Sequence, residues 1–353
     1  MGMRLSEASD LGTAALATYR FDFTGKSGEY FRIWVVSLFL SVVTLGIYSA
    51  WGKVRKKRYV YSHTELDGTG FEFRATPLAI LRGRVIALAL LGGFALSGHV
   101  LPIMQLAFVL ILLVLTPWIV VAASRFNARN TAWRNITFSF DGGIGEAARV
   151  FVGLGAVALL TLGLLYPYAR MRRARFIIAH HRFGETQMRA DLSAGGFFLA
   201  YLLAALMIIG AMVLLVVGVM IFATREAARP GPPGVPTLAT LALLYVVYIA
   251  VFAFLRAQVG NLTQNGVVLG PMRCRSTLRA RDLAWLYLSN IVAILATLGL
   301  ATAWATMRMA RYRARNLYLV GEASPEAFIG TAAAESSATG SEVSDLFDVD
   351  VSL

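Results

Sequence analysis

The sequence predicts an all-α fold, a polytopic bundle of membrane helices with short strand-like segments in its loops. Of the 353 residues, 57% are hydrophobic and only 15% are charged. Soluble domains carry about a quarter charged residues and about 45–50% apolar ones, so this composition excludes a water-soluble single-core domain. The apolar residues are grouped into long segments whose order along the chain is A-B-C-A-B-C-A, an internal repeat.

Seven apolar segments approach or reach the length of about 20 residues that a helix needs to cross a bilayer. They cover residues 30–51, 85–98, 101–123, 150–168, 197–223, 237–255 and 282–305. The first, fourth and seventh are the A segments, and the others form two B–C pairs. Residues 30–320 are therefore predicted to form the membrane domain. A polar segment, residues 1–29, precedes it, and an acidic tail, residues 321–353, follows it with the composition of a disordered chain.

The three A segments share one motif: Thr-Leu-Gly, an aromatic residue seven positions after the Thr, and then a run rich in Arg and Lys. The copies begin at Thr44, Thr161 and Thr297. Gly in an apolar helix permits a break or close packing, and an aromatic followed by basic residues is typical of a membrane interface. The candidate residues are Gly46, Gly163 and Gly299 for a helix break or packing, Trp51, Tyr168 and Trp304 as interfacial aromatics, and Arg55, Arg58, Arg172, Arg175, Arg308 and Arg311 for contact with lipid or another anion.

Two interpretations of this motif stay open. It is either an interface anchor used three times, or three helix ends that converge on one positively charged vestibule. Short alternations of aromatic and polar residues flank the A segments, for example Phe21-Asp22-Phe23, Phe71-Glu72-Phe73 and Phe138-Ser139-Phe140. Such alternation beside Gly indicates short strands or turns outside the bilayer. The local pattern leaves open whether these strands pair into a small cap.

Charge and motifs exclude several function classes. The net charge is +13, but the basic residues flank apolar segments, where they hold loops against an anionic leaflet. No basic run carries the interleaved aromatics of a nucleic-acid platform. The sequence has no phosphate-binding loop and no zinc-protease or serine-hydrolase motif, and Cys274 is its one cysteine. We expect no enzyme activity, catalytic residue, cofactor or metal site. The expected partners are membrane lipids, mainly anionic ones, and a protein partner or homo-oligomer stays open.

Two possible topologies distribute the Lys and Arg residues differently over the two sides of the membrane. If all seven segments cross, 15 basic residues lie on one side and 18 on the other, which gives no orientation signal. If the A segments only dip in and return, 31 lie on one side, and Arg225 and Arg229 remain on the other. The second split fits the positive-inside rule. About 20 apolar residues are nevertheless a natural full span, so both topologies stay open.

The chain resembles the YjgN-type family of bacterial inner-membrane proteins. The residues that carry the resemblance are Phe-Asp-Phe-Thr-Gly-Lys-Ser-Gly-Glu-Tyr-Phe-Arg-Ile-Trp at 21–34 and Thr-Leu-Gly-Ile-Tyr-Ser-Ala-Trp at 44–51. Asn-Thr-Ala-Trp at 130–133 and Trp-Leu-Tyr-Leu-Ser-Asn at 285–290 fit the same family, so the similarity extends over about residues 19–320. The resemblance implies a multi-pass protein of the bacterial inner membrane with unknown function, and it carries over no catalytic residue.

Two functions are compatible with these features. The first is transport or channel-like handling of an anionic or lipid-like solute, with the arginine clusters at a charged mouth. The alternative is a non-catalytic membrane scaffold that binds anionic lipid or a protein partner through the same clusters. A flux of solute across vesicles would favour the first, and specific co-purification of lipid or protein would favour the second.

Overall fold

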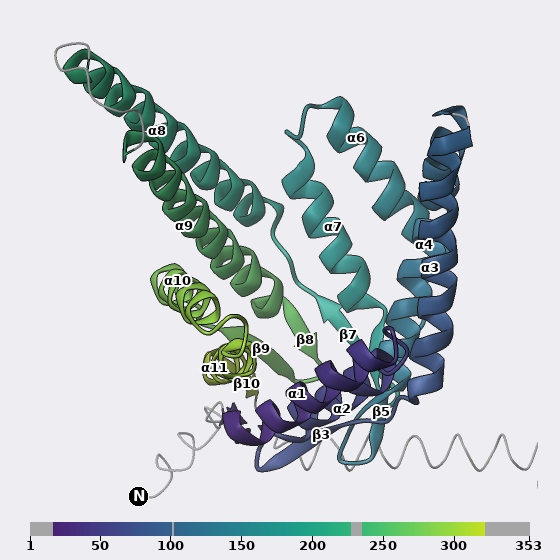
Figure 1. Ribbon diagram of the computed structural model, residues 1–353. Coiled ribbons are helices and arrows are strands. Elements are labelled where there is room, and N and C mark those ends of the chain that lie inside the picture. Colours follow the sequence, from purple (N-terminus) through teal and green to yellow (C-terminus); the bar gives the residue numbers. More distant parts are fainter. Residues whose placement is uncertain (1–16, 101, 227–234, 322–353) are drawn as a thin grey trace, which may run out of the picture.

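A closed β-barrel carries five helical hairpins (Figure 1). This computed structural model describes residues 17–100, 102–226 and 235–321. The first 16 residues of the predicted polar segment, and the acidic tail after Gly321, lie outside the described residues. The prediction of an all-α bundle is wrong, because ten strands join into one antiparallel barrel. Eight of them lie between the hairpins, and the other two lie at the ends of the described chain.

The barrel strands are short and pair in the order β1-β10-β9-β8-β7-β6-β5-β4-β3-β2. Pairing of β1 with β10, for example Tyr19 opposite Leu319, closes the ring. The strands are β1 (Ala17–Phe23), β2 (Thr64–Leu66), β3 (Thr69–Phe73), β4 (Thr131–Trp133), β5 (Ile136–Phe140), β6 (His181–Phe183), β7 (Thr186–Ala190), β8 (Val267–Leu269), β9 (Met272–Ser276) and β10 (Leu317–Gly321). The expected strands at Phe21–Phe23, Phe71–Phe73 and Phe138–Phe140 lie in β1, β3 and β5.

Each hairpin leaves the barrel after one strand and returns to it at the next. The helices are α1 (Ser27–Val43), α2 (Ser49–Ser62), α3 (Pro77–Val100), α4 (Pro102–Arg129), α5 (Ile144–Ala147), the π-helical η1 (Ala148–Gly153), α6 (Leu154–Leu160), α7 (Tyr166–Ala179), α8 (Ala194–Glu226), α9 (Val235–Asn265), α10 (Ala280–Ala296) and α11 (Thr302–Arg315). The segment α5–η1–α6 acts as the first arm of the third hairpin. The chain is thus five successive strand–hairpin–strand units.

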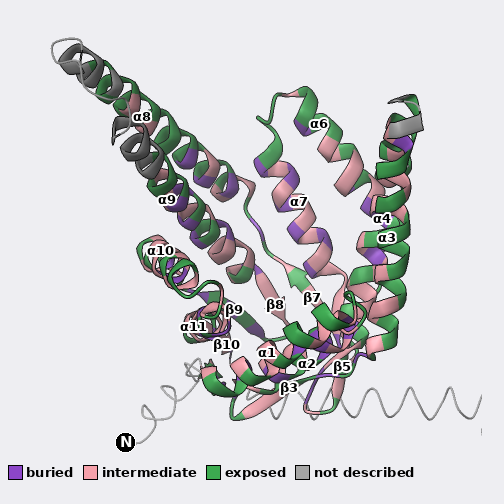
Figure 2. Cartoon of the chain, viewed as in Figure 1, coloured by how far each residue is buried: buried purple, intermediate pink, exposed green. Residues whose placement is uncertain are grey.

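The B and C segments lie in the two long hairpins, α3–α4 and α8–α9. Among the described residues, these hairpins supply four helices that are long and apolar enough to cross a membrane. In the apolar stretch of α3, Pro77–Gly98, Ser97 is the one buried residue. Figure 2 shows the same contrast, with buried residues near the barrel and exposed residues over the outer parts of the hairpins. Exposed apolar surface of this extent fits contact with lipid.

Each A segment contains a turn between two helices. In 30–51 the turn joins α1 to α2, in 150–168 it joins α6 to α7, and in 282–305 it joins α10 to α11. Both ends of each A hairpin therefore enter the same barrel. The three arginine-rich runs, which lie in α2, α7 and α11, consequently lead back to the barrel side of the molecule.

Candidate anion-binding site

A ring of side chains fastens each hairpin to the next. The second helix of each hairpin donates a hydrogen bond to a carbonyl in the loop that follows the first strand of the next unit. The pairs are Arg58 Nη2 to Ala75 O (3.1 Å), Arg125 Nη2 to Gly142 O (3.0 Å), Arg175 Nη2 to Leu192 O (2.9 Å), Asn261 Nδ2 to Leu278 O (2.8 Å) and Arg311 Nη2 to Gly25 O (3.1 Å). In the first four pairs the acceptor lies 17 residues after the donor. Three of the six candidate arginines thus bind the chain's own carbonyls.

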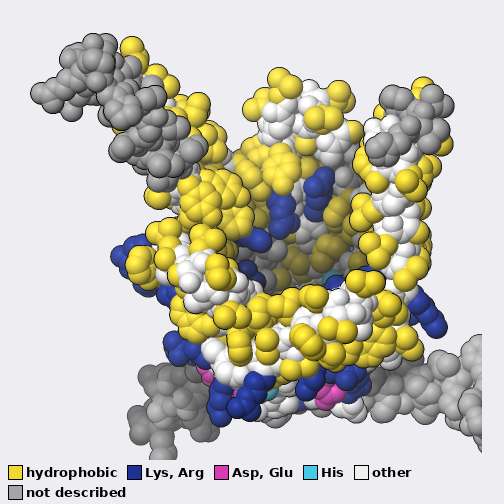
Figure 3. Space-filling view, in the orientation of Figure 1, with side chains coloured by type: hydrophobic (Ala, Val, Ile, Leu, Met, Phe, Trp, Pro, Cys, Tyr) yellow, Lys and Arg dark blue, Asp and Glu magenta, His cyan; other side chains and the backbone are white. Residues whose placement is uncertain are grey.

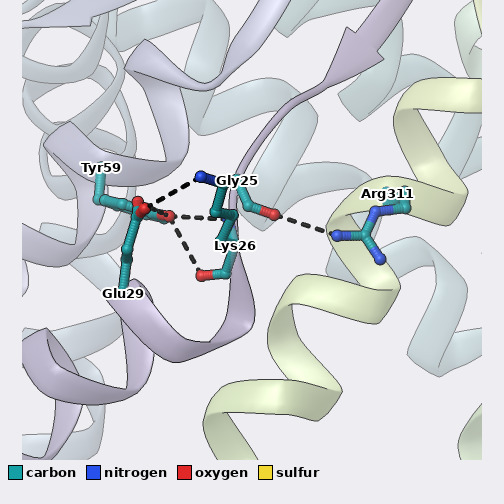
Figure 4. A network of polar contacts seen from close by, with 5 residues as sticks. All are labelled: Gly25, Lys26, Glu29, Tyr59 and Arg311. Carbon is teal, nitrogen blue, oxygen red and sulfur yellow. Dashed lines mark hydrogen bonds and ion pairs between the residues drawn. The ribbon is translucent and has the colours of Figure 1, made fainter.

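The fifth bond of this ring connects the two ends of the described chain (Figure 4). Arg311 of α11 holds the loop after β1 through the Gly25 carbonyl. The phenol oxygen of Tyr59 on α2 lies 2.8 Å from the backbone nitrogen of Lys26 and 3.0 Å from the Glu29 carboxylate. The loop that starts α1 is therefore held from both sides, and the first and fifth units are tied together.

The other three candidate arginines have different surroundings. Arg55 is exposed and Arg172 is half-buried. Arg308 donates through Nη1 to Ser289 Oγ at 2.6 Å and to Asn290 Oδ1 at 3.2 Å. Its guanidinium lies 5.1 Å from the ring centre of Trp304, one of the three candidate aromatics. A guanidinium that is already oriented by neutral partners keeps its positive charge available for an anion.

Arg308 lines a cavity of about 720 Å³ that we call the α10–α11 pocket. Its lining is Arg281, Asp282, Trp285, Leu286, Arg308, Arg311, Tyr312 and Arg315. Four arginines and one carboxylate line the pocket, and an Asp282 oxygen lies 3.6 Å from Arg281 Nε. The indole of Trp285, which is 64% exposed, supplies apolar surface beside these charges. The pocket therefore combines a strong positive charge with an apolar wall.

A larger cavity, of about 850 Å³, lies between α7 and β7 and also contains two arginines, Arg175 and Arg189. It has two arginines, whereas the α10–α11 pocket has four. We therefore regard the α10–α11 pocket as the better anion site.

A hollow opens between the hairpins, and Lys and Arg side chains gather on its wall over α7 (Figure 3). On α2, burial and the charge of Arg84 lower the pKa of Lys56, while burial and the charge of Lys53 lower the pKa of Lys57. Lys57 Nζ also donates to Asn127 Oδ1 at 3.1 Å. A cation that lowers the pKa of a neighbouring lysine lies close to it, and crowded cations attract anions.

Aromatic side chains fill the barrel. Ring centres lie 6.1 Å apart for Phe21 and Phe71, 6.0 Å for Phe71 and Trp133, and 6.0 Å for Trp133 and Phe183. The remaining interior cavity is about 190 Å³ and is lined almost wholly by apolar residues. Hydrophobic packing of this kind favours a sealed barrel over a water-filled channel.

The candidate glycines lie in the three hairpin turns. Their φ angles are +93° for Gly46, +87° for Gly163 and +96° for Gly299, and no atom lies within 4 Å of a Cβ built at any of them. Their positive φ angles end the helices at these turns. No side chain in the described structure packs closely against them, so the predicted packing role has no support. The preceding residues Leu45 and Leu162 have φ values of +48° and +51°. The aromatics Trp51 and Tyr168 are half-buried and Trp304 is exposed.

The family comparison agrees with a membrane protein. The family model described as "Bacterial protein of unknown function (DUF898)" matches residues 18–346. The chain belongs to the DUF898 family. Inner membrane protein YjgN of Salmonella typhimurium strain LT2 is 29% identical over 120 residues, which cover 34% of this chain and 30% of the relative. Inner membrane protein YjgN of Escherichia coli K12 is 30% identical over 130 residues, which cover 35% and 31%.

The aligned regions span about a third of the length of these curated relatives. No solved structure matches the chain. The relatives are named inner membrane proteins, and with the four long apolar helices of this chain they support an integral membrane protein. Family membership names no site residue, so the candidate site rests on the geometry of this chain.

Some residues of the site were missed by the sequence analysis. Asn261 occupies the place that arginine takes in the other four units, and Arg281 and Arg315 complete the α10–α11 pocket. The 17-residue spacing between a polar side chain and a strand-end loop was the available signal for four of the five fastening contacts. Within the described residues, no group of three His, Cys, Asp or Glu side chains could hold a metal ion.

Proposed function

We propose that this protein is a multi-pass inner-membrane protein that binds the phosphate-bearing headgroup of an anionic lipid in the α10–α11 pocket. The single observation that carries the proposal is the lining of that pocket, four arginines beside Trp285 and Leu286. Guanidinium groups bind phosphate oxygens through paired hydrogen bonds, and indole rings favour the boundary between headgroups and acyl chains. A lipid headgroup supplies both kinds of partner at one place.

The distribution of charge supports a cytoplasmic barrel. All five hairpins begin and end in the barrel, so the segments between them lie together on one side of the membrane. If the long hairpins cross and the A hairpins return, 31 of the 33 Lys and Arg residues lie on the barrel side or in the A hairpins. Basic residues near membrane spans stay in the cytoplasm, where the leaflet is anionic.

The position of the α10–α11 pocket agrees with this placement. Arg281 and Asp282 belong to the first turn of α10, close to the barrel, and Arg315 is the last residue of α11 before β10. The pocket therefore opens near the base of a hairpin, at the level where the long helices leave the barrel. Headgroups of the cytoplasmic leaflet would lie at this level.

Lipid retention by the purified protein tests the proposal. The full chain is reconstituted into phosphatidylcholine vesicles with and without phosphatidylglycerol, purified again, and its retained lipid is measured by mass spectrometry. The triple variant Arg281→Gln, Arg308→Gln and Arg315→Gln should lose most of its preference for phosphatidylglycerol. A matched control, Arg20→Gln, Arg74→Gln and Arg275→Gln, removes the same charge from β1, from the residue after β3 and from β9, and should keep the preference.

Two results would oppose the proposal. Equal retention by the parent, the triple variant and the control would show that the pocket binds no lipid headgroup. Loss of the preference when excess inorganic phosphate is added would assign the pocket to a free anion. Lipid that survives phosphate competition supports a site for a whole lipid.

A second candidate function is transport of a lipid-like anion, which is favoured by the basic hollow between the hairpins (Figure 3). Its test uses the same vesicles and a fluorescent anionic lipid. Accelerated movement of that lipid between leaflets would indicate transport, and binding without movement would indicate a scaffold. The aromatic filling of the barrel favours lipid handling over conduction of small ions through the barrel axis.

A further inference from the structure

In each of the three Thr-Leu-Gly turns, at the tip of an A hairpin, the leucine is almost fully exposed. Leu45 is 95% exposed, Leu162 is 93% exposed and Leu298 is 96% exposed. Each has φ close to +50°, a conformation that costs a non-glycine residue about 1–2 kcal/mol. The residues two positions later, Ile47, Leu164 and Leu300, are also exposed. A strained turn that presents leucine outward three times needs an apolar partner.

The turns satisfy most of their own backbone N–H groups. The N–H groups of Gly46, Gly163 and Gly299 each donate to the carbonyl five residues earlier at 2.7 Å. The preceding threonine donates its hydroxyl to the carbonyl four residues earlier, at 2.6 Å for Thr44 and 2.7 Å for Thr297. The same oxygen accepts the N–H four residues later, at 2.9 Å in both turns. Thr161 follows the pattern, with a longer second bond of 3.3 Å to the Leu165 N–H.

This hydrogen-bond pattern suits hydrocarbon better than water. A turn in water can leave its polar groups to the solvent, whereas in lipid each unsatisfied group costs several kcal/mol. Here the threonine hydroxyl bridges the helix end to the next turn, and the glycine N–H closes the loop. Leucine side chains on the outside then meet acyl chains at no cost in hydrogen bonds.

Contacts with the long helices limit how far two of the tips reach. Ser49, the first residue of α2, accepts a hydrogen bond from Arg84, the eighth residue of α3. Tyr166, the first residue of α7, packs against Tyr201, the eighth residue of α8, with ring centres 5.4 Å apart. Seven residues of helix rise about 10 Å. The hydrocarbon core is about 30 Å thick, so tips at this height stay within one leaflet.

The position of the first basic residue after each turn agrees with this depth. Lys53 is the fifth residue of α2, Arg170 is the fifth of α7, and Arg308 is the seventh of α11. These positions lie about 6–9 Å along the helix from its start, which returns the first cation to the headgroup level of the same leaflet. A crossing helix would place about 20 apolar residues between its charged ends.

We propose that the three A hairpins insert their Thr-Leu-Gly tips among the acyl chains of the leaflet on the barrel side and return without crossing. The barrel then lies against the membrane surface, anchored by three half-inserted hairpins. Around the ring, the α6–α7 hairpin separates the two spanning hairpins on one side, and the α10–α11 and α1–α2 hairpins separate them on the other. The occupant of the exposed tips is the acyl region of that leaflet. This inference needs the long hairpins to cross, and it does not depend on lipid binding in the α10–α11 pocket.

Depth-dependent fluorescence quenching tests the inference on the full chain in vesicles. In a Cys274→Ser background, single cysteines replace Leu45, Leu162 or Leu298 and carry an environment-sensitive fluorophore. Asp22→Cys on β1 is the water-exposed reference, and Leu88→Cys on α3 marks the middle of a span. Quenchers are iodide in water and lipids that are brominated at shallow or deep acyl positions.

The expected order of depth is Asp22, then the three tips together, then Leu88. Iodide should quench the tips several-fold less than Asp22, and shallow brominated lipid should quench them more than deep brominated lipid does. Iodide quenching of the tips equal to that of Asp22 would overturn the inference. Tips as deep as Leu88 would also overturn it. Cysteines at Ile47, Leu164 and Leu300 repeat the measurement if a leucine variant fails to fold.

Discussion

Arg308 and Arg311 lie one helical turn apart on α11 and have different partners. Arg311 donates to the Gly25 carbonyl and ties the fifth unit to the first, whereas Arg308 bonds to uncharged side chains and faces the α10–α11 pocket. Arginine can fill both roles because its long apolar stem spans the gap between helices and its planar head donates in several directions.

Substitution of Arg311 tests the ring of hairpin contacts. Arg311→Met keeps the apolar stem and removes the donor to Gly25, so we expect a loss of about 1.5–3 kcal/mol of stability, the range for a hydrogen bond from a charged group. Thermal unfolding in detergent should show a midpoint several degrees below that of the parent. Arg313→Met, an exposed arginine two residues later, is the control and should unfold close to the parent. Equal shifts for the two variants would refute this role of Arg311.

Cys274 offers a second prediction at the residue scale. Burial in the barrel raises the pKa of the Cys274 thiol from 9.0 to about 11, so the flanking arginines do not activate it. The thiol therefore stays protonated at pH 8, and the thiolate is the reactive form. We expect no labelling by a maleimide in the folded protein and full labelling after denaturation. Asp22→Cys in a Cys274→Ser background should label rapidly under both conditions, and rapid labelling of folded Cys274 would contradict the account.

At the scale of the element, the Thr-Leu-Gly turn makes the A hairpin. Gly163 has φ of +87°, where an added Cβ meets no neighbour but the backbone is unfavourable for an L-residue. We expect Gly163→Ala to destabilise the protein by about 1 kcal/mol through the backbone alone. Gly145→Ala in α5 also adds a Cβ into open space, without a positive φ, and should be neutral or slightly stabilising. Thermal unfolding of the two variants side by side checks this, and similar behaviour would contradict it.

The sequence revealed the motif of this turn but not its shape. The Thr-Leu-Gly repeat was visible in all three A segments, yet a leucine with positive φ is rare, and leucine within an apolar run is typical of a continuing helix. The candidate arginines show the same limit. Their positions at the ends of apolar segments predicted an interface, but the carbonyls that Arg58, Arg175 and Arg311 contact lie in the next unit.

At the scale of the whole molecule, the closed barrel is the feature that sequence reasoning did not find. Alternating Phe residues predicted three of its strands, while strands such as β2 and β6 have only three residues and leave almost no periodic pattern. Closure joins β1 to β10, about 300 residues apart in the sequence. Such a contact is invisible to local propensity, so the helical content dominated the fold prediction.

Disulfide trapping tests the closure directly. Thr18 on β1 pairs with Val320 on β10, and opposed antiparallel residues have Cα atoms about 4.5–5.5 Å apart, within reach of a disulfide. In a Cys274→Ser background, Thr18→Cys with Val320→Cys should crosslink rapidly under mild oxidation. Thr18→Cys with Arg273→Cys lies two strands apart, about 10 Å, and should not. The mobility of the oxidised and reduced chains on a denaturing gel separates the outcomes, and an uncrosslinked first pair would argue against the closed ring.

The central claim is that every hairpin returns to one cytoplasmic barrel. Its most direct test is labelling of single cysteines at Ser62, Gln187, Arg315 or Gly234, in a Cys274→Ser background, by a membrane-impermeant thiol reagent in intact bacterial cells. Ser62 and Arg315 are the last residues of the first and third A hairpins, and Gln187 lies in β7 after the second. Gly234 precedes α9 in the connection between the second pair of long helices. The account predicts that Gly234 is labelled in intact cells, and that the other three are labelled only after the cells are permeabilised. Labelling of Ser62 and Arg315 in intact cells, with Gln187 protected, would show that the A segments cross and would contradict the account.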